Sequence, residues 1–270
     1  MTVRNNAGTL RDSLETVLPQ VAGEGELVIV DSLSNDGTQA ILAEVARTHP
    51  EVTVIERSCH RGDGRNLAVA LAHTSIVVTQ VDGDNRYAPG VLRALALHVR
   101  DHPSCDAAFG IGNGDFDPSS THVYAWRKEA FERVGGYEPR QEREEPPLWL
   151  RAFRGGLRFE RVLLPRLADD LKPRRAGSSP TVSPWRRGTH MMWGARIFRV
   201  IGFRYPEYVR LLRLTRRTTA RFLAGITIGG VAYLQGAWHG DGPDILLRDI
   251  PPTAPGLAPE SSPPQGPGPP

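Results

Sequence analysis

Short apolar runs alternate with segments of helical periodicity through the first half of the chain, and this alternation limits the fold more than any other feature. The runs Leu27–Val30, Val52–Glu56 and Ile76–Val81 predict strands. Apolar residues recur at helical spacing in the segments around them, which predicts helices at Leu10–Leu18, Thr38–Thr48, Asn66–Ala72 and Val91–Val99. Strands separated by single helices form a mainly parallel sheet with helices on its faces, so we predict an α/β fold. Ligands of such sheets bind beyond the carboxyl ends of the strands.

Polar side chains follow the first of these strands. Asp31 ends the strand, and Ser34 and Asp36 lie in the turn before the next helix. A carboxylate and turn of this kind suit a nucleotide's ribose or base. The alternative is an ordinary capped helix, because Ser, Asn and Asp are good N-cap residues.

A glycine-rich segment, residues 62–66, opens the next predicted helix and contains Arg65 and Asn66. Flexible glycines and an arginine at a helix N-terminus suit a diphosphate. The alternative is a glycine turn with a surface arginine.

Two carboxylates, Asp82 and Asp84, follow the apolar run Ile76–Val81. Burying them is costly without a cation, and oxygen ligands suit Mg²⁺ or Mn²⁺ bridging to phosphates. We favour this metal site over the alternative, an Asp-Gly turn between strands.

Adjacent glutamates, Glu144 and Glu145, precede another apolar helix. One of them could be a general base that takes a proton from a hydroxyl. Acidic residues at a helix start also interact with the helix dipole, which is the structural alternative.

Taken in order, these segments resemble glycosyltransferases of family 2 with the GT-A fold, over about residues 3 to 165. The family's N-x-x-x-x-L stretch is matched from Asn5 to Leu10, its V-D-D-G-S-T-D-G-T-like segment by Val30–Thr38, and its D-x-D by Asp82 and Asp84. Residues ending at Arg65 and Asn66 match the family's G-x-x-x-x-R-N segment. Trp126–Tyr137 matches its acceptor-side hairpin and helix, and Glu144–Arg151 matches its E-D-x-x-L-x-x-R. Here Ser32-Leu33 replaces the usual Asp-Gly, and glutamate replaces the aspartate of E-D.

The resemblance implies an inverting transfer from a nucleoside-diphosphate sugar to an acceptor hydroxyl, assisted by Mn²⁺ or Mg²⁺. Asp31 would contact the nucleotide base, Asp82 the ribose or the metal, and Asp84 the metal. Glu145 would be the base, with Glu144 as the alternative. The donor site would also include Asn5, Ser34, Asp36, Arg65 and Asn66.

Charge is distributed unevenly along the chain. Residues 1–145 carry 14 basic and 22 acidic side chains, whereas residues 146–250 carry 19 basic and 7 acidic ones. Many family members act on lipid-linked acceptors, so the basic, aromatic-rich second half predicts contact with an anionic membrane surface or with the phosphate of a lipid-linked or glycan acceptor. An acidic first half disfavours nucleic acid as a partner.

We therefore divide the chain into a GT-A domain at 1–170, a mainly helical extension at 171–250 and a disordered proline-rich tail at 251–270. The uncharged stretch Phe222–Trp238 predicts an interfacial helix, with a transmembrane helix and a core or dimer helix as less favoured alternatives. These features place the protein in the cytoplasm at the inner face of the membrane. His190 is a weak candidate for a further metal ligand, since a lone histidine beside apolar residues is more often structural.

The start of the chain predicts no signal peptide. Residues 1–3 leave two alternatives for the first strand, a stub or a strand that begins upstream of Met1. Two other functions fit part of the pattern: a nucleotidyltransferase of related fold, or an inactive membrane-associated scaffold.

Overall fold

The protein is described by a computed structural model, which covers residues 1–111, 123–139, 144–164, 168–171, 199, 203–215 and 219–238. The strands are β1 Thr2–Val3, β2 Leu27–Asp31, β3 Val52–Glu56, β4 Ile76–Thr79, β5 Asn85–Tyr87, β6 Ala107–Ile111, β7 Val123–Arg127, β8 Phe159–Leu163 and β9 Ala168–Asp170. The helices are α1 Leu10–Val21, α2 Thr38–Thr48, α3 Arg61–Leu71, α4 Val91–Asp101, α5 Lys128–Arg133, α6 Glu145–Arg154, α8 Tyr205–Thr215 and α9 Thr219–Trp238.

The predicted strand and helix alternation is confirmed, and two of the boundary differences affect the residues of the predicted site. Helix α3 begins at Arg61, five residues before the predicted start, so the glycine-rich segment lies inside its first turns. Strand β4 ends at Thr79, and Gln80 follows with a positive φ of 63°. This left-handed residue, which is not glycine, bends the chain away from the strand before the two aspartates.

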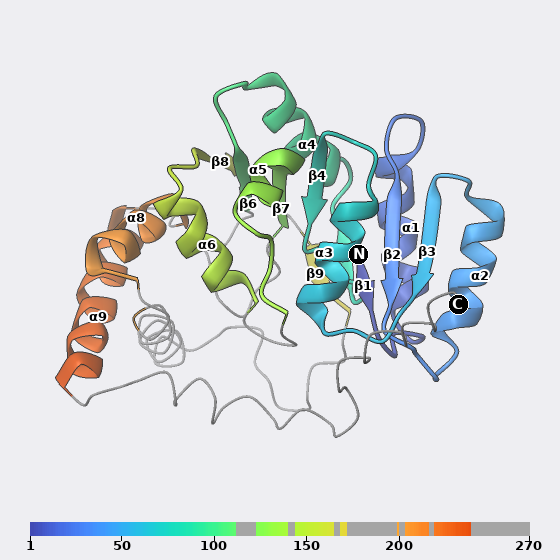
Figure 1. Ribbon diagram of the computed structural model, residues 1–270, viewed down its shortest axis with the longest axis horizontal. Coiled ribbons are helices and arrows are strands. Elements are labelled where there is room, and N and C mark those ends of the chain that lie inside the picture. Colours follow the sequence, from blue (N-terminus) through green and yellow to red (C-terminus); the bar gives the residue numbers. More distant parts are fainter. Residues whose placement is uncertain are drawn as a thin grey trace, which may run out of the picture.

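The strands form a mixed sheet in two parts (Figure 1). One part has the order β1-β2-β3 and is parallel, and the other has the order β4-β7-β6-β8 with β7 antiparallel to β4 and β6. A parallel bridge from Thr2 to Asp82 joins the two parts. Strands β5 and β9 form a small separate ribbon.

Helices cover both faces of this sheet, and strand β7 shows how the sequence specifies the two layers. Tyr124 and Trp126 point into the cluster that also holds Leu148 of α6. Their neighbours Val123 and Ala125 point into the opposite cluster, which helices α1 and α4 help to fill. Side chains of a strand alternate between faces, so a strand with four successive buried residues belongs in the middle of a helix–sheet–helix sandwich.

Helix α8 packs against α6, and α9 packs in turn against α8 (Figure 1). Tyr208 of α8 lies in the same apolar cluster as Trp126, and Glu207 pairs with Arg154 of α6 at 3.0 Å. The rings of Tyr205 and Tyr208 lie over Gly230 and Gly229 of α9, where any added methyl group would collide with a tyrosine hydroxyl.

Next to these contacts, α9 exposes apolar side chains to solvent. Leu223, Val231 and Leu234 are 50%, 54% and 67% exposed. Neither α9 nor any other described helix combines the length and apolar character that crossing a bilayer requires, which sets aside the transmembrane alternative for Phe222–Trp238. His190 and the tail 251–270 lie outside the described residues.

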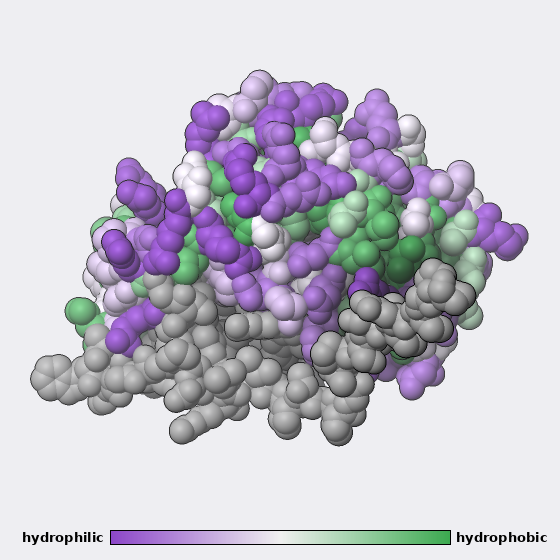
Figure 2. Space-filling view, in the orientation of Figure 1, coloured by the Kyte–Doolittle hydropathy of each residue, from purple (hydrophilic) through white to green (hydrophobic). Residues whose placement is uncertain are grey.

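A cavity of about 320 Å³ separates the two parts of the sheet. Its walls include Leu27 and Val28 of β2 and the β4 residues Ile76–Thr79. The Met1 amino group lies at this cavity and donates a hydrogen bond to the Val28 carbonyl at 2.8 Å. Desolvation lowers the pKa of this amine from 8.0 to about 5. Apolar surface is also visible over β2 and β3 beside α3 (Figure 2).

Candidate active site

The loops that follow β1 and β2 are bound to each other. The Asn5 backbone N–H donates to Ser34 Oγ at 2.8 Å, and the Asn35 N–H donates to Asn5 Oδ1 at 3.0 Å. Asp36 accepts from the Ala7 N–H at 3.0 Å and from the Thr38 N–H at 3.1 Å. Three of the predicted donor-binding residues, Asn5, Ser34 and Asp36, therefore hold the two loops in register.

Asp31 ends β2 and is fully buried. Its carboxylate accepts hydrogen bonds from the Ser34 N–H, at 3.1 Å to Oδ2, and from the Ser34 hydroxyl. The short turn thus folds around the carboxylate, and Leu33 inside it takes a positive φ of 52°. The carboxylate is held at the carboxyl end of the sheet with its charge compensated by local donors.

Arg65 of α3 connects three elements of the site. Its guanidinium donates to Asp82 Oδ1 at 2.8 Å and to Glu144 Oε1, and it lies 5.6 Å from the centre of the Tyr137 ring. The side chain is only 6% exposed, and the neighbouring carboxylates keep its pKa raised despite desolvation. A buried cation therefore joins the end of β4 to the start of α6.

The structure distinguishes the two adjacent glutamates. Glu144 is the N-cap residue of α6, is 2% exposed and pairs with Arg65. Glu145 is partly exposed, and its Oε2 accepts a hydrogen bond from the Tyr124 hydroxyl at 3.3 Å. Burial raises the pKa of both carboxyls, while Arg65 acts in the opposite direction on each.

The two prolines after Glu145 are compatible with the start of helix α6. They occupy its first turn, where backbone N–H groups have no partner within the helix. Glu145 is therefore the first residue of a regular helix.

Two residues of this cluster, Tyr124 and Gln80, were missed from the sequence. Both lower the pKa of Glu145, against the larger effect of desolvation. The Gln80 side chain is buried, and its Nε2 has no partner of normal hydrogen-bond geometry among the described residues. The sequence suggests only a core residue of β7 at Tyr124, and the one signal for Gln80 was a polar side chain within the apolar run Ile76–Val81.

Asn66 has a structural role that the sequence did not reveal. Its side chain donates to the Tyr137 carbonyl and accepts from the Tyr137 N–H, both at 2.8 Å. Gly136, with φ of 61°, leaves room for this amide, because a Cβ there would lie 2.5 Å from Asn66 Oδ1. Asn66 therefore fixes the turn that carries Tyr137 to Arg65.

The carboxylates that follow β4 are suited to bind a divalent cation. Asp82 retains 33% of its side-chain exposure, and only its Oδ1 is bonded to Arg65. Asp84 is partly exposed and accepts from Asn85 Nδ2 at 3.2 Å. Both contribute hard oxygen ligands, which Mg²⁺ and Mn²⁺ prefer.

The sheet thus brings Asp31, Arg65, Asp82, Glu144 and Glu145 to its carboxyl edge, at the ends of β2 and β4 and the start of α6. The sequence model of glycosyl transferase family 2 matches residues 1–159. The chain belongs to this family.

The chain is also similar to a further protein sequence and to solved structures. An uncharacterised protein of Mycobacterium tuberculosis, MT1568, is 31% identical over 105 residues, a match that covers 39% of this chain and about a third of that relative. Mannosyltransferase PcManGT of Pyrobaculum calidifontis, solved with GDP-Man and Mn²⁺, is 17% identical with a TM-score of 0.55 over 92% of this chain and 76% of its own.

Glucosyl-3-phosphoglycerate synthase of Mycobacterium tuberculosis is 19% identical with a TM-score of 0.51, over 64% of this chain and 71% of its own. These likenesses establish the GT-A fold, and the family match favours the glycosyltransferase prediction over the nucleotidyltransferase alternative.

Proposed function

We propose that this family 2 member transfers a sugar from a nucleoside-diphosphate sugar to an acceptor hydroxyl, with inversion. The observation that carries this proposal is the Arg65 link between Asp82 and Glu144. It brings the start of α6, and with it Glu145, beside the carboxylates at the end of β4. A donor held by those carboxylates would have its reacting carbon near Glu145.

Glu145 is the proposed general base. Unlike Glu144, it has no ion pair among the described contacts and is partly exposed, so an acceptor hydroxyl can reach it. The acceptor oxygen attacks the anomeric carbon while the bond from that carbon to the diphosphate breaks. The hydroxyl proton passes to Glu145, and the nucleoside diphosphate leaves.

Asp31 and Asp82 are the proposed donor-binding residues, and Asp82 and Asp84 would hold Mn²⁺ or Mg²⁺. When bound, the cation would neutralise charge that develops on the departing diphosphate. Two similar structures support this class of donor, since one was solved with GDP-Man and Mn²⁺ and another, GalNAc-T7, with UDP, GalNAc and Mn²⁺.

Release of nucleoside diphosphate, measured with a panel of sugar donors and acceptors, tests this function. We expect Glu145→Gln to reduce kcat at least about 100-fold with little change in donor KM, because the base acts only in the transition state. Glu24→Gln, an exposed glutamate in the loop before β2 at the amino end of the sheet, is the matched control and should retain full activity. Absence of release with every donor would instead support the inactive-scaffold alternative.

Glu144→Gln separates the two glutamates. It removes the ion pair with Arg65, so we expect lower thermal stability together with weaker donor binding. If Glu144→Gln abolishes turnover in a folded protein while Glu145→Gln retains it, the roles assigned to the two residues are reversed.

The acceptor side is proposed to face an anionic membrane, which would place the protein at the cytoplasmic face. Support comes from the exposed apolar side chains of α9 and from the positive charge of residues 146–250. We expect the full chain to float with anionic vesicles and not with neutral ones. Val231→Ser combined with Leu234→Gln should reduce flotation without lowering turnover of a water-soluble acceptor.

A further inference from the structure

A second cluster of chemically reactive side chains lies at the other end of the sheet. It consists of His98 from α4, Cys105 from the loop before β6, and Glu160 of β8. Strands β4, β6 and β8 run in the same direction, and Cys105 precedes β6 whereas Asp82 follows β4. The cluster is therefore separate from the carboxyl edge that holds the candidate active site.

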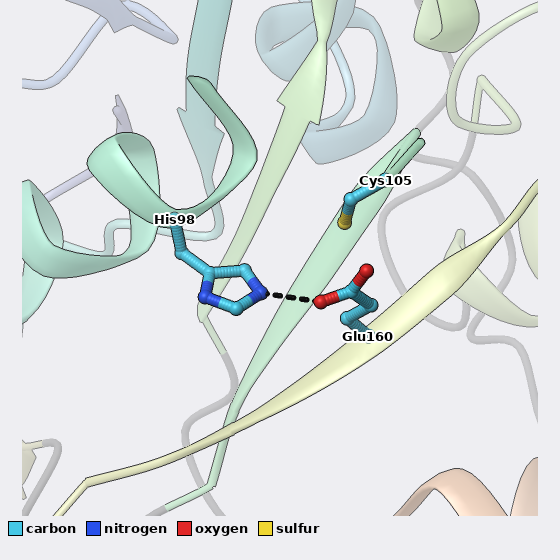
Figure 3. A group of neighbouring side chains, drawn as sticks. All are labelled: His98, Cys105 and Glu160. Atoms are coloured by element: carbon cyan, nitrogen blue, oxygen red, sulfur yellow. Dashed lines mark hydrogen bonds and ion pairs between the residues drawn. The ribbon is translucent and has the colours of Figure 1, made fainter. Parts of the chain in front are cut away.

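The three side chains point toward one another (Figure 3). One ligand atom from each, an imidazole nitrogen, the thiol sulfur and a carboxylate oxygen, lies within 4.8 Å of the other two. His98 Nε2 is 2.7 Å from Glu160 Oε2. Ligands around a tetrahedral zinc ion are separated by about 3.5 Å, so side-chain adjustments on the order of 1 Å would close the site.

The backbone that carries the cluster is held firmly. Arg127 donates to the carbonyls of Val99, His102 and Cys105 at 2.7 to 3.0 Å, which fixes the segment between α4 and β6. The His102 ring stacks on the His98 ring with centroids 4.1 Å apart, which restricts the orientation of His98. Such support by surrounding residues is typical of metal ligands.

Access and chemistry are also compatible with a metal ion. Cys105 is buried, whereas the His98 and Glu160 side chains are 22% and 37% exposed, so an ion could enter from solvent. Nitrogen, sulfur and oxygen donors together suit Zn²⁺, in contrast to the all-oxygen pair at Asp82 and Asp84.

We propose that His98, Cys105 and Glu160 form a binding site for Zn²⁺, with water as the fourth ligand, that joins α4 to β6 and β8 away from the candidate active site. A bound ion would tie helix α4 to the neighbouring strands β6 and β8 at the amino end of the sheet.

Cobalt substitution in the metal-free full chain tests the sulfur ligand. Co²⁺ bound to a thiolate gives a charge-transfer absorption band, which we expect in the unmodified protein and not in Cys105→Ser. Cys59→Ser is the matched control, since Cys59 belongs to the other side of the molecule and should leave the band unchanged. Absence of the band in the unmodified protein, or its survival in Cys105→Ser, overturns the proposal.

Zinc titration by calorimetry tests the remaining ligands, in an Asp84→Asn background that weakens the other candidate metal site. We expect one Zn²⁺ per chain, a higher melting temperature on binding, and a loss of affinity of at least about 100-fold in His98→Gln. His73→Gln is the matched control, because His73 also contacts a glutamate, Glu26, at 3.0 Å but has no cysteine beside it. Equal affinities in these two variants would show that the His98–Glu160 contact is only an ion pair.

Discussion

In a polypeptide that begins at Met1, the buried amino group makes stability depend on pH in a predictable direction. Its pKa falls from 8.0 to about 5 on folding because the amine loses contact with water. Between these values the unfolded chain holds a proton that the folded chain releases, so stability decreases as pH falls from 8 to 5. The full shift corresponds to about 4 kcal/mol.

Extending the chain before Met1 should remove this dependence. The extension would convert the amine into a peptide N–H that keeps the hydrogen bond to Val28. An extension of four β-branched residues would match the length of β4, whose residues Ile76–Thr79 line the cavity. Each would gain about 1.5–3 kcal/mol by burial and lose about 1–2 kcal/mol by ordering. The pH-independent gain in the free energy of unfolding is therefore small. The pH-dependent difference in stability between the extended and unextended chains is the clearer signal.

Urea unfolding at pH 5, 6, 7 and 8 measures this difference, after mass spectrometry has confirmed that Met1 is retained. The extended chain should gain stability over the unextended one by an amount that grows by up to about 1.4 kcal/mol per pH unit toward pH 5. An extension of glycine and serine is the control: it removes the amine and leaves the cavity unfilled. Equal pH dependence in the extended and unextended chains would refute a desolvated amine at this position.

Three further predictions concern the candidate active site. Arg65→Met should lower the free energy of unfolding in urea by about 3–5 kcal/mol, because Glu144 would stay buried without its partner; a loss below about 1 kcal/mol would contradict this. Gly136→Ala should lower the melting temperature, since φ is 61° and the methyl group would press on the amide that holds the turn; an unchanged melting temperature would argue against that packing. The turnover rate should fall with decreasing pH below a pKa higher than that of an ordinary glutamate, because Glu145 must be ionised and its pKa is raised. Tyr124→Phe should move the pH at which turnover falls to a still higher value, because the hydrogen bond from Tyr124 lowers the pKa of Glu145. An unchanged pH dependence would show that Tyr124 does not affect the pKa of the base.

Strands and helices with strong periodicity were predictable from the sequence. Thr38–Thr48 and Val52–Glu56 have the predicted boundaries, because apolar spacing and flanking turn residues agree there. The start of α3 was placed too late, since two glycines in its first turns suggested a loop. At Gly64 the small residue is needed because Thr2 approaches closely, and an added Cβ there would lie 2.6 Å from Thr2.

Charged residues at strand ends were also predictable, because their position follows from the topology of a parallel sheet. Their partners were not, since those come from distant segments. The link from Arg65 to Glu144 spans 79 residues, and nothing in either local sequence indicates it. Asn66 likewise reads as a ligand residue, and only the fold shows that both ends of its amide hold Tyr137.

The glycines of α9 carry a consequence for how its hydropathy is read. Gly229 and Gly230 reduce the apolar character of the helix, yet each is where a tyrosine ring of α8 rests, and a larger residue would push the helices apart. The two glycines are needed because α8 and α9 pack closely at these positions. The reduced mean hydropathy of α9 therefore reflects a steric requirement of this contact as well as polarity. Because the Tyr205 and Tyr208 rings pack against the two glycines, rotation of α9 about its axis would break this contact. Leu223, Val231 and Leu234 are thereby aimed in one fixed direction relative to the sheet.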